Sequence, residues 1–515
     1  MTKDAEGADQ PARLVVERLA TEGLTGRAFD PDEIITDVEL RLDMDRSLGP
    51  LVGGDDVDVP QPFGASLTRP VPELAAALRS GAITATGLAE RFLATEAASR
   101  DRLHSFVVVD ADRLLAEAAQ ADTELAAGRD RGPLHGVLVG VKDIIDVAGY
   151  PTRCGSPLYP VTPVETDADV ITRLRAAGAL VAGKTTTHEL ACGVVSAPAS
   201  NPWNTDHLPG GSSGGSGVAV SAGLVPIGLG SDTGGSVRIP AALCGVVGHK
   251  PTYGLVSLRG VEPLSASLDH LGPLGRTVAD CAHALTALAS NGTDFASDLS
   301  HGIAGMRFGV LTDVPFAPIQ PDVEAAFYTA VDVLRALGAE CIPVRIPELE
   351  HTLAVEFGII PLEAYSYHQD SLRDRGPEID PSIRTLLTAG AVLPHSIFRR
   401  ASAARVRIAQ AIADAMTAHR VVALVTPTLP ATASSKAESE LRYGDAAEDI
   451  ATSYVRTTAP FNLSGQPAIS VPCGLDCSGL PIGLQIATAA GTDALTFRVA
   501  AAYERETPWS SMTPP

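Results

Sequence analysis

The spacing of hydrophobic residues along the chain predicts alternating helices and strands from residue 71 onward. Hydrophobic residues three or four positions apart, the period of an amphipathic helix, occur in four segments: 71–81, 110–128, 166–179 and 321–340. Short hydrophobic segments typical of strands lie between them, at 136–141, 180–185 and 341–347. This order favours an α/β fold, with a central parallel or mixed sheet flanked by helices.

Two further segments carry more local signals. Thr166, followed three residues later by Asp169, resembles a capping box and predicts that a helix starts there with Thr166 as its N-cap. The polar segment 431–449 has no clear period, so we expect a surface loop or a lid in that region.

Residues 1–70 differ from the rest of the chain. Segments 12–24 and 32–51 have the pattern of amphipathic helices, and the segment 53–64, rich in Gly, Asp and Pro, is typical of a linker. We therefore predict a mainly helical N-terminal extension, 1–70, and one large α/β domain, 71–515. The acidic N-terminus has no apolar run typical of a signal peptide, so we expect a cytoplasmic protein.

Charge and cysteine content narrow the function classes. A net charge of −22 repels phosphate backbones, and no basic patch is visible, so we expect no nucleic-acid partner. No apolar run reaches the roughly 20 residues of a membrane span. The seven cysteines are scattered, without metal-ligand spacing, so we expect small buried side chains and no metal ion.

The candidate chemistry lies in two clusters of serine and glycine, "PGGSSGGSG" from Pro209 and "GSDTGGSVR" from Gly230. The first lacks the lysine of a phosphate-binding loop, and no strand precedes it as in a nucleophile elbow. The Asp-Thr-Gly at Asp232 occurs once, whereas aspartic proteases need two carboxylates. Tight turns would explain glycine but not serine. A hydroxyl beside free backbone N–H groups suits a nucleophile with an oxyanion hole.

The stretch "GGSSGGSGVAVSAGLVPIGLGSDTGGSVRIPAALCGVVGHKPTYG" resembles the signature of the amidase signature family, the Ser-Ser-Lys hydrolases. The resemblance extends over residues 71–515. It implies a single α/β/α catalytic domain with a twisted mixed sheet, no cofactor, a small-molecule amide substrate and, as is common in the family, a homodimer. It also implies the nucleophile Ser236, the relay serine Ser212 beside a cis peptide bond, and the base Lys142. The implied oxyanion hole consists of the N–H groups of Thr233, Gly234, Gly235 and Ser236.

The chemistry of these residues agrees with the resemblance. A serine hydroxyl needs a base, and a lysine can act as one only if burial lowers its pKa. Lys142 ends a strand-like segment, so an apolar setting is expected, although Asp143 and Asp146 would oppose the shift if they faced the amine. Ser212 would relay the proton, and the acyl group would pass to Ser236 and then to water.

Other residues carry weaker hypotheses. Asp232 and Arg238 flank the nucleophile, and we interpret them as a pair that braces the turn. Ser213 is expected to support the site or to serve the turn. Cys154 and Cys192 are expected either to line the pocket or to lie in the core. His188, in "THELACG", lacks a second histidine at zinc-binding spacing and is expected to pack.

The substrate hypotheses are a stand-alone amidase, acting on a primary amide, an anilide or a carbamate, and a second enzyme of the family. That second candidate is the glutaminase subunit of a tRNA-dependent amidotransferase, which "GSDTGGSVR" resembles. In that enzyme an aspartate holds the amino group of glutamine seven residues before the position of Asn462, whereas this chain has Val455 there. A binding protein without catalysis is disfavoured because Lys142, Ser212 and Ser236 are all present.

Overall fold

The computed structural model describes residues 68–515, so the predicted N-terminal extension lies outside the described residues except for its last three. Eleven strands form one mixed sheet in the order β1-β3-β2-β4-β6-β5-β12-β13-β9-β7-β8. Their bounds are β1 Phe106–Val108, β2 Leu138–Lys142, β3 Leu180–Thr185, β4 Ile227–Asp232, β5 Val247–Lys250, β6 His270–Gly275, β7 Arg307–Val310, β8 Glu340–Pro343, β9 Ala423–Pro427, β12 Ala468–Leu475 and β13 Pro481–Thr488.

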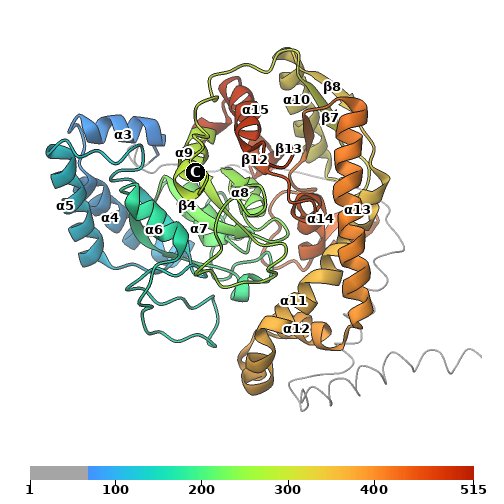
Figure 1. The fold of residues 1–515 in the computed structure, drawn as a ribbon, viewed down its shortest axis with the longest axis horizontal. Helices are drawn as coiled ribbons and strands as arrows, with labels where there is room; N and C mark the ends of the chain where they lie inside the picture. The colour runs from blue at the N-terminus through green and yellow to red at the C-terminus, as the bar shows by residue number, and fades with distance from the viewer. Residues whose placement is uncertain (1–67) are drawn as a thin grey trace, which may run out of the picture.

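Helices flank this sheet, and α11, α12 and α13 pack together into a projection beside it (Figure 1). The helix bounds are α3 Val71–Arg79, α4 Ala85–Leu103, α5 Ala111–Ala126, α6 Asp169–Ala176, α7 Gly214–Ser221, α8 Arg238–Leu243, α9 Val278–Leu288, α10 Pro321–Ala336, α11 Thr352–Arg375, α12 Pro381–Val392, α13 His395–His419, α14 Ile450–Leu463 and α15 Asp493–Arg505. The predicted α/β architecture with a central mixed sheet is confirmed.

Helices cover both faces of the sheet where β4 and β6 pair. Ile227 pairs with Gly275, so both lie on one face, and a Cβ on Gly275 would come within 2.7 Å of Asp280 in α9. The next residue of β4, Gly228, points to the opposite face, where a Cβ would come within 3.0 Å of Ser216 in α7. The sheet is therefore sandwiched between α7 and α9, which explains why every residue of β4 is buried.

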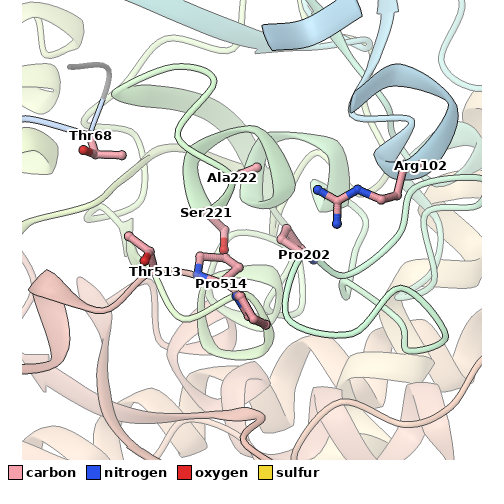
Figure 2. A pocket seen from close by; sticks show the side chains of 8 residues that line it. Thr68, Arg102, Pro202, Ser221, Ala222, Thr513 and Pro514 are labelled. Atoms are coloured by element: carbon pink, nitrogen blue, oxygen red, sulfur yellow. The ribbon is translucent and has the colours of Figure 1, made fainter. Parts of the chain in front are cut away.

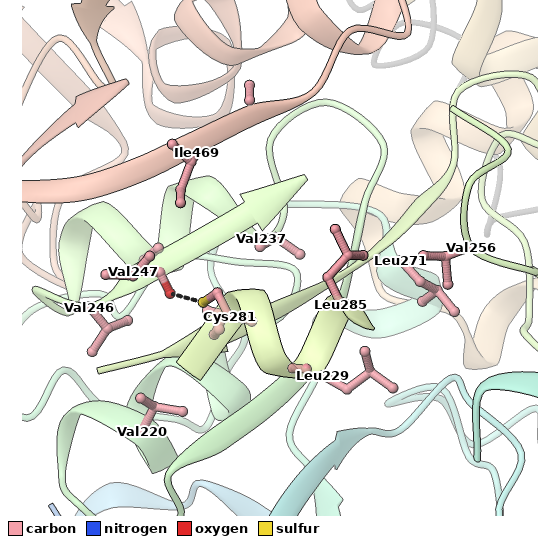
Figure 3. Packing of buried hydrophobic residues seen from close by; sticks show 14 of the residues in the cluster. Val220, Leu229, Val237, Val246, Val247, Val256, Leu271, Cys281, Leu285 and Ile469 are labelled. Atoms are coloured by element: carbon pink, nitrogen blue, oxygen red, sulfur yellow. Dashed lines mark hydrogen bonds between the residues drawn. The ribbon is translucent and has the colours of Figure 1, made fainter. Parts of the chain in front are cut away.

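The hydrophobic core beside β4 joins segments far apart in sequence (Figure 3). Leu229, Leu271 and Ile469 come from three different strands of the sheet and are at most 1% exposed. Cys281 of α9 lies among them and its Sγ donates to the Val247 carbonyl at 3.6 Å. This packing holds the end of β4, from which the second serine and glycine cluster emerges.

Three expectations from the sequence need correction. Helix α6 begins at Asp169 with Ala168 as N-cap, so the capping box at Thr166 is wrong. The segment 431–449 is not only a loop, because residues 440–449 form a two-stranded hairpin, β10 Glu440–Tyr443 and β11 Ala446–Asp449. Of the seven cysteines, Cys341 is partly buried and Cys477 is exposed, so the expectation of burial holds for five.

Candidate active site

The predicted catalytic residues converge at one edge of the sheet. Strands β2 and β4 run parallel and end at Lys142 and Asp232, so the segments that follow them emerge at the same edge. The loop before α7 brings Ser212 to this place. Lys142 and Ser212 are both 0% exposed, whereas Ser236 is 7% exposed. Of the three, only Ser236 reaches solvent. A nucleophile needs such access, because it must contact the substrate.

The lysine and the first serine are in direct contact. Lys142 Nζ donates to Ser212 Oγ at 2.7 Å and to Ser231 Oγ at 2.8 Å. The Gly211–Ser212 peptide bond is cis, as the family resemblance implies. Ser231 was missed by the sequence reasoning, although it stands directly before Asp232 in the same signature. The amine is therefore held between two hydroxyl groups, one of which is the predicted relay.

The two serine and glycine clusters are tied to each other through Ser213. Its hydroxyl donates to the Ser231 carbonyl at 3.0 Å and accepts from the Ser231 N–H at 3.2 Å. Its N–H donates to the Ser236 carbonyl at 3.3 Å. Within residues 68–515 the Ser236 hydroxyl itself makes no hydrogen bond. Ser213 thus has a structural role, and it keeps Ser212 and Ser236 on adjacent loops.

Burial gives Lys142 the acid–base property that the sequence reasoning required. The loss of hydration on burial lowers the pKa of Lys142 to about 7, against the opposing effect of the Asp269 and Asp232 carboxylates. These opposing groups differ from the expected Asp143 and Asp146. Asp143 instead lies 2.9 Å from Lys184 Nζ. The free amine needed in a base is therefore accessible near neutral pH.

This pKa leads to a pH prediction. Below pH 7 Lys142 is an ammonium and cannot accept a proton, so amide hydrolysis is expected to rise with pH and level off above about pH 7. The measurement is the pH dependence of kcat/KM between about pH 5 and pH 9. Lys250 is also fully buried with a pKa lowered to about 7, but its Nζ donates to two backbone carbonyls. A Lys250→Met variant should keep the same profile, and a profile that is flat in the wild type would contradict the assignment.

The loop from Thr233 to Ser236 has the features of an oxyanion hole. Within residues 68–515 the N–H groups of Gly234, Gly235 and Ser236 have no acceptor, so they are available to a substrate oxygen. Gly235 has φ +136°, and a Cβ there would lie 2.2 Å from Thr458 Oγ1, so only glycine fits.

Both sides of this loop are held by side chains that the sequence reasoning did not find. Thr458 of α14 donates its hydroxyl to the Gly234 carbonyl at 2.5 Å. On the other side, Thr233 Oγ1 donates to Asp269 Oδ1 at 2.6 Å. Thr458 lies more than 200 residues after the signature and Asp269 lies 15 residues after it, so neither belongs to the two serine and glycine clusters.

The predicted brace between Asp232 and Arg238 is present and fully buried. The two side chains make a bidentate pair, with distances of 3.0 and 2.8 Å. The remaining guanidinium N–H groups donate to the Thr458 carbonyl, Gln485 and Asn462. Arg238 thus connects the nucleophile loop to α14 and β13, and all five of its donors are used within the protein.

This network carries a stability prediction. Arg238→Met would leave the Asp232 carboxylate buried without its cation, which typically costs about 3–5 kcal/mol. We expect the free energy of unfolding in urea to fall by about that amount. Arg335, which pairs with Asp332 on the surface, is the matched control, and Arg335→Met should cause a much smaller change. Equal changes in the two variants would refute the role of Arg238 as a brace.

Of the remaining predicted residues, His188 is partly buried, and Cys154 and Cys192 are buried. His188 Nδ1 accepts the N–H groups of Val195 and Ser196 at 3.1 and 3.3 Å, so it has the expected packing role. Cys154 and Cys192 belong to the main hydrophobic cluster, at 0% and 5% exposure, which matches the second of their two expected placements.

A separate small cavity lies near the C-terminus and holds none of the predicted site residues (Figure 2). It is lined by residues that include Thr68, Ser221 and Pro514, and its volume of about 20 Å³ is enough for about one water. This cavity is too small for an amide substrate.

The part of the chain that the structure describes contains neither a membrane-spanning helix nor a candidate metal site. Between Thr68 and Pro515 no helix is long and apolar enough to cross a membrane. In the same range, no three His, Cys, Asp or Glu side chains are grouped so that they could hold a metal ion.

The chain is similar to known proteins over most of its length. The Amidase family model matches residues 88–497. The chain belongs to the amidase signature family. Membership of this family supports an amidohydrolase activity, and it accords with the serines, lysine and free N–H groups gathered at the end of β4.

Two curated relatives are similar over most of their length. The A-type subunit of the glutamyl-tRNA(Gln) amidotransferase of Roseiflexus castenholzii is 37% identical, covering 85% of this chain and 95% of the relative. An "Amidase" of Pseudomonas putida is 36% identical, covering 87% and 98%. A solved structure described as an amidase superposes with a TM-score of 0.79 at 35% identity, covering 85% of this chain and all of that one. Overall identity therefore does not separate the two kinds of enzyme within the amidase signature family.

Proposed function

We propose that this protein is a stand-alone amidase that hydrolyses a carboxamide-type C–N bond through an acyl-enzyme on Ser236. The observation that carries the proposal is the 2.7 Å hydrogen bond between Lys142 Nζ and Ser212 Oγ at the end of β2. A buried lysine with a pKa of about 7 is suited to take a proton, and a hydroxyl in contact with it is suited to relay one.

In the proposed acylation step, Ser236 Oγ attacks the scissile carbonyl carbon. Its proton passes to Ser212 Oγ, and the Ser212 proton passes to Lys142 Nζ. The negative charge that develops on the carbonyl oxygen is met by the N–H groups of the loop after β4. The relay then runs backward, so that the leaving nitrogen takes a proton as the C–N bond breaks. Ser236 is 7% exposed, and its hydroxyl would make a hydrogen bond with Ser212 once a substrate is bound.

Deacylation follows the same route with water as the nucleophile. Water attacks the ester carbon on Ser236, its proton passes to Ser212 Oγ, and the Ser212 proton passes to Lys142 Nζ. The bond between the acyl carbon and Ser236 Oγ then breaks, the relay returns a proton to Ser236 Oγ, and a carboxylic acid is released. The products are this acid and ammonia or an amine. No cofactor takes part in either step.

A second candidate is a glutaminase subunit of a tRNA-dependent amidotransferase, since the first relative named above is of that kind. The residue Val455 disfavours the glutaminase candidate. Its Cγ1 lies 3.3 Å from the Cβ position of Gly234, so this residue faces the proposed oxyanion loop without a carboxylate of its own. The amidotransferase pattern has an aspartate at this place in the sequence.

The test is hydrolysis across a primary amide, an anilide, a carbamate and glutamine, with hydroxylamine added to intercept an acyl-enzyme. Release of ammonia or amine together with a hydroxamate is expected for at least one of the first three. Cleavage of glutamine alone would favour the amidotransferase candidate. Hydrolysis without hydroxamate formation would contradict the covalent intermediate.

A further inference from the structure

A buried carboxyl group without a partner faces the proposed oxyanion loop. Glu356 lies in the second turn of α11 and is 0% exposed. Neither of its oxygens has a hydrogen-bond partner among residues 68–515. A Cβ built on Gly234 would lie 2.7 Å from Glu356 Oε1, which puts this oxygen within about 4–5 Å of the Gly234 α-carbon.

The charged groups around Glu356 make hydrogen bonds with other residues. Asp232 is paired with Arg238, whose five donors are used elsewhere, and Asp269 accepts from the Thr233 hydroxyl. Arg405 of α13 attracts the carboxylate electrostatically, but its Nε donates to a backbone carbonyl of α14. Within residues 68–515, no donor of these groups makes a hydrogen bond with either Glu356 oxygen.

Such a group is costly to the fold. A buried polar group that lacks a hydrogen bond destabilises a protein by about 1–3 kcal/mol. Burial also raises the pKa of Glu356 well above its ordinary value, in spite of the attraction by Arg405. A leucine at this position would avoid both penalties, so the packing of α11 gives no reason for a glutamate.

We propose that Glu356 is a specificity residue that pairs with an amino group on the acyl part of the substrate. This inference rests on the proposed amidase function and names the substrate class of the same site. The scissile carbonyl oxygen would lie at the N–H of Gly234, and Glu356 Oε1 faces that same glycine. The amino group recognised is therefore close to the reacting carbon, on the α- or β-carbon of the acyl group. Substrates of this class are α- or β-amino acid amides.

The test compares alaninamide with propionamide, which differ by a single amino group. The wild type is expected to show at least about a tenfold higher kcat/KM for alaninamide, because a site built around a polar group rejects an analogue that lacks its partner. Glu356→Leu should remove this preference, and Glu356→Gln, which keeps the size of the side chain but no charge, should give an intermediate ratio. The matched control is Glu96→Gln, a buried glutamate of α4 paired with Arg100, which should leave the ratio unchanged.

The outcomes separate this inference from the proposed function. If propionamide hydrolysis depends on Ser236 but the wild type shows no preference for alaninamide, the inference on Glu356 is overturned and the amidase function stands. A preference that Glu356→Leu retains within about twofold overturns it as well. If neither amide is hydrolysed, the melting temperature of Ser236→Ala is measured with each compound. A larger increase with alaninamide that disappears on adding Glu356→Leu supports the inference, and equal increases overturn it.

Discussion

Ser236→Ala is expected to lower kcat/KM for amide hydrolysis by about 10,000-fold or more. The substitution removes the one hydroxyl of the proposed relay that is accessible to a substrate. Without it no acyl-enzyme forms, and the oxyanion loop alone can provide only a small residual acceleration. The measurement is steady-state hydrolysis of the preferred amide, together with loss of hydroxamate formation.

The control for this variant is a serine of the same neighbourhood with a purely structural bond. Ser221 of α7 is buried, and its hydroxyl donates to the Cys244 carbonyl at 2.6 Å. Ser221→Ala should cost about 1 kcal/mol of stability and leave kcat/KM largely unchanged. Retention of more than about a tenth of the wild-type activity in Ser236→Ala would show that another group is the nucleophile.

Lys142→Met is expected to lower kcat by about 1,000-fold or more, because it removes the general base. Methionine has a similar length and no charge, so it suits the fully buried site and should not weaken the fold through an unpaired cation. The activity that remains should no longer rise with pH through about pH 7, the value to which the pKa of Lys142 is lowered.

Lys250→Met again provides the matched control. Lys250 has the same burial and a pKa lowered to about 7, but it contacts neither Ser212 nor Ser231. Its replacement is expected to change stability and to leave the pH dependence of hydrolysis in place. If both lysine variants lost activity to the same extent, the loss would reflect damage to the buried core and not the removal of a base.

The secondary structure was predictable where a long periodic segment packs by one face. The segment 321–340 predicted a helix, and α10 occupies Pro321–Ala336. The helix start at Thr166 was predicted wrongly because the side chain that the local pattern relied on binds residues distant in sequence. The carboxylate of Asp169 is bound by Ser257 and Arg259 and is not used in a capping box. The hairpin at 440–449 did have a local signal, Gly444–Asp445 between the two strands, which is a common two-residue turn.

The candidate site likewise contains residues that the sequence predicts and residues that it does not. The signature containing Ser212 and Ser236 is contiguous enough to be identified from sequence, and so is Lys142 at the end of its strand. Thr458 and Glu356 have no such pattern. They act on Gly234 from α14 and α11, more than a hundred residues away in the chain, and only the folded backbone brings them there.

The family, the α/β class, several helices and strands, and the candidates Ser212, Ser236 and Lys142 are predictable from the sequence. These features depend on local periodicity and on a nearly continuous signature. The properties that suit these residues to the proposed chemistry depend on the fold. Burial lowers the pKa of Lys142 to about 7, and packing leaves Glu356 without a partner. Hydration and hydrogen-bond partners depend on which distant segments surround a side chain, and the linear sequence does not specify those neighbours.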